Sequence, residues 1–324
     1  MGARRLARRL NLIGMLGKRL LLVIPMVLIV SIIMFLLASL VPGDQARTIL
    51  GENASPEAVA ALRKQLGLDL PPIQQYLNWA LNALQGDLGS SIYSGEPVTS
   101  ILAGRLPVTL SLMVLSTLAI GVVGIVLGLA SALRGGWLGR VLDAISLVGL
   151  AVPGFAIAIF AVSLLAVTVR IFPATGYVPL HVSLGGWLWT LVLPVFALSL
   201  GGTTLVAKQV RDSAKDALAK DYVRFLRANG VSETSIVLRH VLKNAAIPAV
   251  TVLGIGAIAS LTGTVFVENV FVLPGLGTMA TQATLNHDLP VLLGIGVLFT
   301  LITVFINLLV DIVYGVLNPK VRAA

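Results

Sequence analysis

The stretch LPVTLSLMVLSTLAIGVVGIVLGLASAL, residues 106–133, contains no Asp, Glu, Lys or Arg and decides the class of fold. A helix needs about 20 residues to cross a hydrocarbon layer of about 30 Å, and this run is longer. Its apolar residues do not alternate with polar ones, which excludes a strand of a membrane barrel. We therefore expect an all-α protein, because only helices and closed barrels satisfy their backbone hydrogen bonds in lipid.

Further apolar runs have the same character. Of the 324 residues, 57% are hydrophobic and only 11% are charged, and the mean hydropathy is +0.96. The run at 171–207 begins with the turn-rich stretch FPATGYVPLHVSLGG (172–186), so its helix is expected near 187–206. The run at 269–287 is broken by Asn, Pro, Gly and Thr and is not counted. The sequence predicts a polytopic membrane protein with six transmembrane helices: 20–43, 106–133, 144–169, 187–206, 244–267 and 289–312.

Basic residues set the expected orientation, because Lys and Arg near a membrane prefer the cytoplasmic side. The termini, 1–19 and 313–324, and the connection 207–243 are expected to be cytoplasmic, whereas 44–105 and 268–288 are expected to be extracytoplasmic. With this topology only five of the 23 Lys and Arg residues lie outside: Arg47, Arg63, Lys64, Arg105 and Arg170. The topology also explains the net charge of +9, which in a soluble protein would suggest nucleic acid.

The sequence offers no catalytic or metal-binding constellation. It has no Cys, and its histidines, His181, His240 and His287, share no ligand spacing, so no metal site is expected. It contains no nucleophile with a base and an orienting group, and no GxxxxGK[ST] phosphate loop. We expect a chain that is not an enzyme, holds no cofactor and receives its energy from another polypeptide.

The outer segment 44–105 is expected to be a small helical cap. Ser55-Pro56-Glu57 is typical of a helix start, and Gly67 of a helix end. The stretch PPIQQYLNWALNALQG predicts a second helix, which runs from a proline entry to Gly86.

The inner connection 207–243 is the largest one expected on the cytoplasmic side. Its first part predicts an amphipathic helix, because apolar residues recur at helical spacing: Val210, Ala214, Ala217, Leu218, Tyr222 and Phe225. Gly230 is typical of a left-handed cap, and Ser232 can start a second helix with Glu233 in its first turn. The pattern predicts a helix, a glycine corner and a second helix that project from the membrane. From the pattern alone, this basic segment could equally lie on anionic lipid.

Within this connection, RFLRANG (224–230), followed by HVLK (240–243), resembles the EAA loop of ABC importer permeases. The longer stretch DYVRFLRANGVSETSIVLRHVLKNAAIPAVT (221–251) is similar to the peptide and nickel branch of that family. Phe225 and Leu226 stand where small residues are usual, and Lys243 occupies a proline position. Other strings agree in order and spacing along nearly the whole chain: LVPGD (40–44), RLPVTLSL (105–112), VENVFVLPGLG (267–277), NHDLPVLLG (286–294) and NPKVR (318–322).

The long outer segment resembles the B-type subunit of dipeptide and oligopeptide permeases. This resemblance implies the six-helix type I importer fold, a C-type permease partner, two ABC ATPase subunits that bind ATP and Mg, and an extracytoplasmic solute-binding protein. It also implies that a coupling helix sits in a groove of the ATPase. Carried over by position, the contact residues are Arg227, Ala228, Asn229, Gly230, Val231 and Ser232, with Asp221, Tyr222 and Glu233 beside them.

The expected function is ATP-driven import of small peptides across a bacterial cytoplasmic membrane, with nickel chelates or glutathione as alternatives. A secondary transporter would place ionisable groups at the middle of repeated halves, and these spans are uncharged there. A membrane scaffold without a pore is not excluded by composition, but it is disfavoured by the family resemblance.

Two further features are weaker. Glu268, at the outer end of the fifth span, could face the translocation path, or it could equally pair at a subunit seam or with the cap. Gly124 and Gly128 form a GxxxG pattern that allows close helix approach, although the pattern also occurs by chance in glycine-rich spans.

Overall fold

The computed structural model describes residues 21–37, 39–40, 45–51, 53–134, 136–137, 139–141, 144–145 and 152–317. The expected cytoplasmic N-terminus 1–19 and the strings LVPGD and NPKVR lie wholly or largely outside these residues. Within them, the secondary structure is helical apart from one isolated bridge between Ser90 and Pro97. The all-α prediction is confirmed for the part of the chain that the structure describes.

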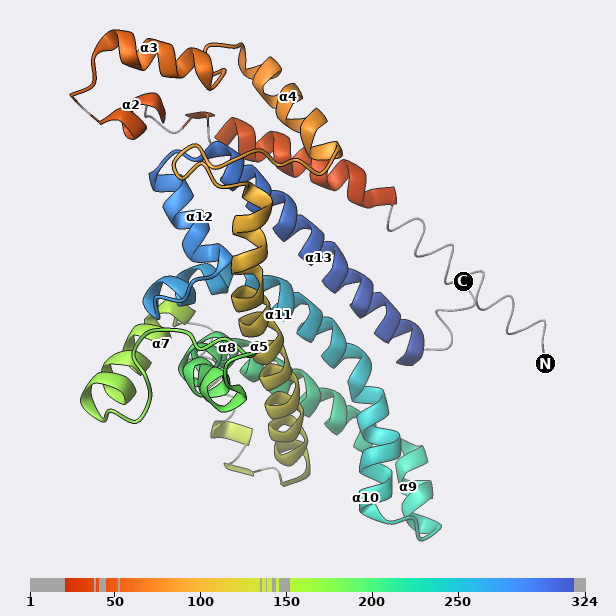
Figure 1. Ribbon diagram of the computed structural model, residues 1–324. Helices are drawn as coiled ribbons and strands as arrows, with labels where there is room; N and C mark the ends of the chain where they lie inside the picture. The colour runs from red at the N-terminus through yellow and green to blue at the C-terminus, as the bar shows by residue number, and fades with distance from the viewer. Residues whose placement is uncertain are drawn as a thin grey trace. The chain divides into compact units, whose positions relative to one another are not determined.

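Figure 1 shows the order of the helices along the chain, and π-helical segments are marked η. An apolar helix, Leu21–Leu37, comes first. The labelled elements are α2 (Gln45–Leu50), α3 (Pro56–Gln65), α4 (Pro72–Leu84), α5 (Val98–Arg134), α7 (Gly154–Ala161), η1 (Val162–Thr168), α8 (Leu184–Leu218), α9 (Asp221–Ala228), α10 (Glu233–Ser235), η2 (Ile236–Val241), α11 (Leu242–Val270), α12 (Leu276–Leu285) and α13 (Leu289–Leu317).

Four helical stretches of the described chain are long and apolar enough to cross a membrane: Val98–Arg134, Leu184–Leu218, Glu233–Val270 and Leu289–Tyr314. Leu21–Leu37 and Gly154–Thr168 are shorter apolar helices, so the expected number of six spans is not established. The expected third span, 144–169, lies partly outside the described residues. Within it, α7 begins at Gly154, because Pro153 precedes it in an extended conformation.

The chain divides into two compact units, which we describe separately. The smaller unit comprises 17–109 and 274–304. Its two outer helices begin and end as expected: Ser55 Oγ accepts a hydrogen bond from Ala58 N at 3.2 Å, and Gly67 and Gly86 have φ of 67° and 87°. The core joins the start of α5 to α12 and α13 through buried apolar side chains: Val98, Ile101, Leu102, Leu276, Ala283, Val291, Leu292 and Ile295.

Helix α12 lies within the run 269–287, which is not counted as a membrane span because Asn, Pro, Gly and Thr interrupt it. Tertiary packing stabilises it: Leu276 is fully buried, and its backbone N–H donates to the buried Thr109 Oγ1 at 2.9 Å. Thr281 and Thr284 donate their hydroxyls to backbone carbonyls one turn earlier. The hydroxyls are thereby satisfied within the helix.

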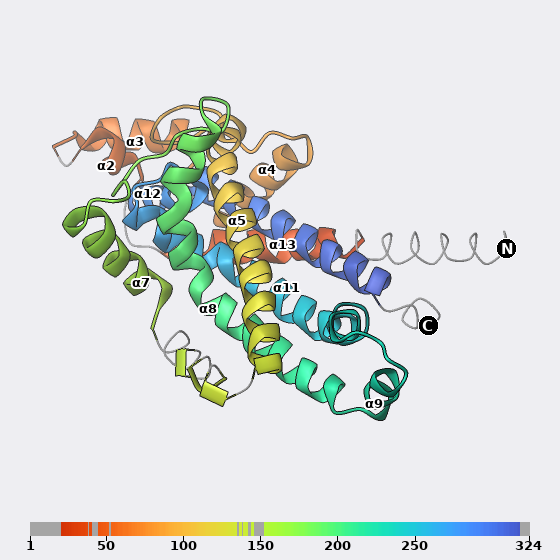
Figure 2. The same ribbon diagram turned by 90° about the horizontal axis from the view of Figure 1, so that it is seen from below.

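Among the described residues, the larger unit comprises those of 110–273 and 305–317. Within it, α5 and α8 lie side by side (Figure 2). A Cβ added at Gly124 would lie 2.8 Å from Val206 Cγ1, and one added at Gly128 would lie 2.5 Å from the carbonyl oxygen of Ala207. The close approach predicted from these two glycines is confirmed.

Candidate functional site

The stretch from α9 to α10 forms an exposed corner on the larger unit. Val223 of α9 is fully buried and belongs to a small apolar cluster with Ala214, Ala217, Ile236 and Val241. This cluster holds the end of α8, α9 and η2 together. The corner therefore rests on a packed base, although its outer surface is exposed to solvent.

Gly230 ends α9 with a φ of 73°, as predicted. Its N–H donates to the carbonyl of Arg227 at 3.0 Å, and the N–H of Val231 donates to the carbonyl of Leu226 at 3.1 Å. These two bonds are the Schellman pattern of helix ends, and the expected apolar partners, Leu226 and Val231, both pack against the cluster. The left-handed residue is glycine because a side chain is unfavourable at this φ.

The second half of the corner begins at Ser232, whose Oγ accepts a hydrogen bond from Ser235 N at 3.4 Å. Arg227 and Glu233 close the corner: Arg227 Nε donates to Glu233 Oε1 at 2.6 Å, and Nη2 donates to Oε2 at 3.2 Å. Glu233 is the exposed first residue of the stretch Glu233–Val270 and precedes its uncharged part, 244–267; hydrogen bonding from Arg227 lowers the pKa of Glu233. The bidentate pair links the end of α9 to the start of α10.

The structure brings the predicted coupling residues together on this corner. All of them are exposed except Val231, which is half-buried: Arg227, Ala228, Asn229, Gly230, Ser232, Asp221, Tyr222 and Glu233. Asn229 donates its side-chain N–H to the carbonyl of Phe225 at 2.8 Å, and Tyr222 accepts from Asn244 Nδ2 at 3.0 Å. The described arrangement is a protruding, mostly polar surface.

The prediction of one amphipathic helix through Phe225 is wrong. Helix α8 ends at Leu218, Lys220 is extended, and α9 starts afresh at Asp221. Because of this break, the residues of α9 do not continue the apolar face of α8. Leu226 packs inward, and Phe225 is 69% exposed. Sequence reasoning missed Phe225 as part of the exposed surface, and the signal available was the Ala219-Lys220-Asp221 interruption.

Glu268 lies in α11 and is fully buried. A cavity of about 410 Å³ opens nearby and is lined by Pro153, Phe155, Phe266 and Val267 among others, but Glu268 does not line it. A translocation role for Glu268 stays a prediction.

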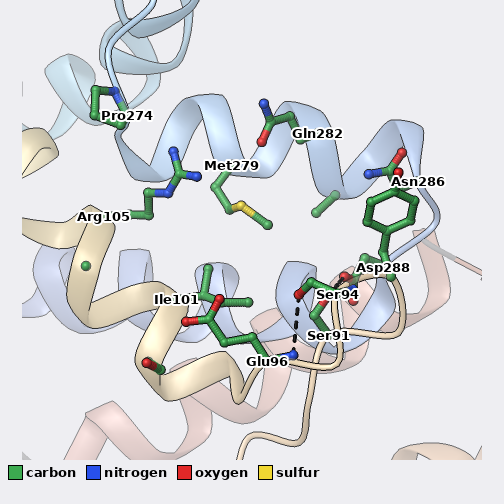
Figure 3. A pocket seen from close by; sticks show the side chains of 14 residues that line it. Ser91, Ser94, Glu96, Ile101, Arg105, Pro274, Met279, Gln282, Asn286 and Asp288 are labelled. Carbon is green, nitrogen blue, oxygen red and sulfur yellow. Dashed lines mark hydrogen bonds between the residues drawn. The ribbon is translucent and has the colours of Figure 1, made fainter.

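A pocket of about 600 Å³ lies within the smaller unit (Figure 3). One wall is α12, and the other is formed by the first turns of α5 and the loop before it. At one end Asp288 is buried; it accepts a short hydrogen bond from Ser91 Oγ and a second from Ile92 N at 3.3 Å. Sequence reasoning did not find this pocket, because its walls are almost two hundred residues apart in the chain.

The described part of the chain is helical, has several stretches long and apolar enough to cross a membrane, and carries a short exposed helix pair, as expected for a polytopic transport permease. Residues 124–323 match the family described as "Binding-protein-dependent transport system inner membrane component", and residues 12–113 match the description "Binding-prot-dependent transport system membrane comp, N-term". The chain belongs to this family of ABC importer permease subunits and is a multi-pass membrane protein.

Named relatives agree with the family. A putative peptide transport system permease protein of Brucella abortus is 41% identical over 306 residues, which cover 94% of this chain and 98% of the relative. A glutathione transport system permease protein of Salmonella choleraesuis is 38% identical over 308 residues, with 94% and 97% covered. The solved MetNI methionine ABC transporter, inward facing, is similar in fold with a TM-score of 0.56 at 18% identity, over 68% of this chain and 97% of that one.

Proposed function

We propose that this chain is the B-type transmembrane subunit of an ATP-driven importer of small peptides in a bacterial cytoplasmic membrane. The relative from Brucella abortus and a probable peptide ABC transporter permease of Sinorhizobium fredii, 36% identical over 306 residues, support the peptide class. The relative named for glutathione supports the same class, since glutathione is itself a tripeptide.

The observation that carries the proposal is the exposed corner at 221–235. A Schellman cap and a bidentate ion pair hold this short helix in a defined conformation, as a contact that receives force from a partner requires. In this proposal the corner docks on ABC ATPase subunits, which bind ATP and Mg, while this chain is non-catalytic. Closure of the ATPases then shifts the pore between inward and outward access.

Contacts within each unit support the proposed topology. Ser91 of the outer segment 44–105 bonds to Asp288 of the outer segment 268–288. Arg211 of the inner segment 207–243 donates to the carbonyl of Gly139, in the inner loop 134–143, at 3.3 Å. Segments expected on one side of the membrane thus meet each other. The proposed assembly adds a C-type permease, two ATPases and an extracytoplasmic solute-binding protein.

The test introduces a large, charged side chain on the corner. Ala228→Arg should abolish copurification of the ATPases and ATP-driven uptake of a labelled tripeptide into proteoliposomes, because Ala228 is exposed at the proposed contact. Ala61→Arg, at an exposed position of α3, is the matched control and should retain both. Normal copurification and uptake by the Ala228→Arg protein would contradict the coupling role.

A further inference from the structure

The pocket in Figure 3 is lined by one cationic side chain, Arg105, and by two anionic ones, Glu96 and Asp288, of which Asp288 already accepts hydrogen bonds from Ser91 and Ile92. Arg105 projects from α5 toward the α12 side, and Glu96 lies on the α5 side near Ile101. Neither side chain takes part in an ion pair within the described residues. Their charges are therefore available to a ligand.

The remaining walls suit a ligand that is polar along its length. Hydroxyls come from Ser94 and Ser100, and side-chain amides come from Gln282 and Asn286. Met279 supplies a flexible apolar surface that adapts to different ligand side chains. The volume of about 600 Å³ is within the range of small-ligand sites, about 300–1,000 Å³.

The base of the pocket is preorganised. Asp288 holds the loop before α5 through Ser91 and Ile92, and Ser91 Oγ also accepts from Ser94 N at 3.0 Å. The Glu96 N–H donates to Ser94 Oγ at 3.4 Å (Figure 3). A loop fixed in this way loses less entropy when a ligand binds.

We propose that this pocket binds a short peptide with unblocked termini, with Arg105 taking the C-terminal carboxylate and Glu96 taking the N-terminal ammonium. A guanidinium fork matches a carboxylate, and hydroxyls and amides can bond to the peptide groups between the ends. Arg105 and Glu96, which are unpaired among the described residues, favour a ligand that carries both charges, and the choice of a peptide rests on the proposed function.

A concave pocket favours a small peptide over a docking protein, which needs an extended surface of about 800 Å² on each partner. The two ends should contribute unequally. Arg105 is half-buried, whereas Glu96 is exposed and is screened by solvent. Blocking the carboxyl end of the peptide should therefore weaken binding more than blocking its amino end.

The experiment uses the full transporter complex in nanodiscs, without solute-binding protein or nucleotide. Binding of trialanine, N-acetyl-trialanine and trialanine amide is measured by equilibrium dialysis. Arg105→Gln should weaken trialanine about tenfold or more, yet leave the affinity for trialanine amide unchanged. Glu96→Gln should weaken trialanine by less and leave N-acetyl-trialanine unchanged. Arg105→Lys, which keeps the charge, should retain part of the affinity.

Matched controls are Lys64→Gln and Asp69→Asn, exposed charges of the same unit that do not line the pocket, and both should bind trialanine normally. Equal weakening of trialanine and its amide by Arg105→Gln would overturn the assignment. A wild-type complex that binds no trialanine would also overturn it. ATP-driven uptake of peptide by the wild-type complex tests the proposed function separately. If the complex binds trialanine but does not take it up, the proposed function fails and the binding site stands.

Discussion

At the residue scale, substitutions of Gly230 should be unfavourable because of its backbone conformation and not because of a steric clash. Its φ is 73°, and an added Cβ would meet nothing within 4 Å. A side chain in this left-handed region costs about 1–2 kcal/mol, less for Asn and more for a β-branched residue. We expect peptide uptake per ATP hydrolysed to fall from Gly230→Asn to Gly230→Ala to Gly230→Val, whereas membrane insertion of all three variants should be unchanged. Equal uptake by Gly230→Val and the wild type would count against this corner as the coupling element.

The ion pair beside Gly230 has a definite pH signature. Hydrogen bonds from Arg227 lower the pKa of Glu233 below its ordinary value of 4.5. A lowered carboxyl pKa means that the stabilisation is complete above the unfolded pKa and is lost as the pH falls through the folded pKa. The pair should therefore persist throughout the neutral range and break only in acid. Titration of ¹³C-labelled Glu233 by NMR checks this, and Arg227→Gln should raise the pKa.

At the scale of elements, the contact between α5 and α8 should be sensitive to one methyl group. Gly128→Ala places a Cβ 2.5 Å from the carbonyl oxygen of Ala207 and should destabilise the protein by about 1–3 kcal/mol. Gly121→Ala, in the same helix, meets Leu253 at an ordinary 3.5 Å and should be neutral or slightly stabilising. The midpoints of thermal unfolding of the two variants are compared in detergent. Equal midpoints would show that α5 and α8 can move apart at Gly128 without a loss of stability.

Asp288 should stabilise the loop before α5 by accepting its hydrogen bonds. Asp288→Ala leaves Ser91 Oγ and Ile92 N without their acceptor, at a cost of about 1–3 kcal/mol. Asp288→Asn keeps one acceptor oxygen and should cost less. Hydrogen exchange at the Ile92 amide should be fastest in the Ala variant. Exchange as slow as in the wild type would mean that other contacts hold the loop.

Elements with strong local signals were predictable, and those that depend on distant partners were not. The glycine ends at 67, 86 and 230 were predictable because a left-handed residue has few candidates. The break between α8 and α9 was missed, because periodicity continued across a two-residue interruption. Helix α12 and the pocket beside it depend on contacts such as Leu276 with Thr109, which no short stretch of sequence encodes.

At the scale of the whole molecule, the chain has no cysteine, so single cysteines can report its topology without removing native thiols. In right-side-out vesicles, a membrane-impermeant maleimide should label Lys64→Cys and Leu285→Cys. It should label Ala228→Cys only after the membrane is opened. All three positions are exposed in the structure, so access to reagent is decided by the side of the membrane. Labelling of Ala228→Cys in sealed vesicles would reverse the proposed orientation.

The two arms of the corner differ in helical geometry. The chain arrives from α8, a single α-helix of 35 residues that reaches about 50 Å at about 1.5 Å per residue. It leaves through η2, six residues of wider π turns whose hydrogen bonds span five residues. A π turn holds one residue more than an α turn and is frequent at functional sites. Deleting one residue of η2 should therefore restore regular α-helical turns before α11 and lower peptide uptake per ATP hydrolysed.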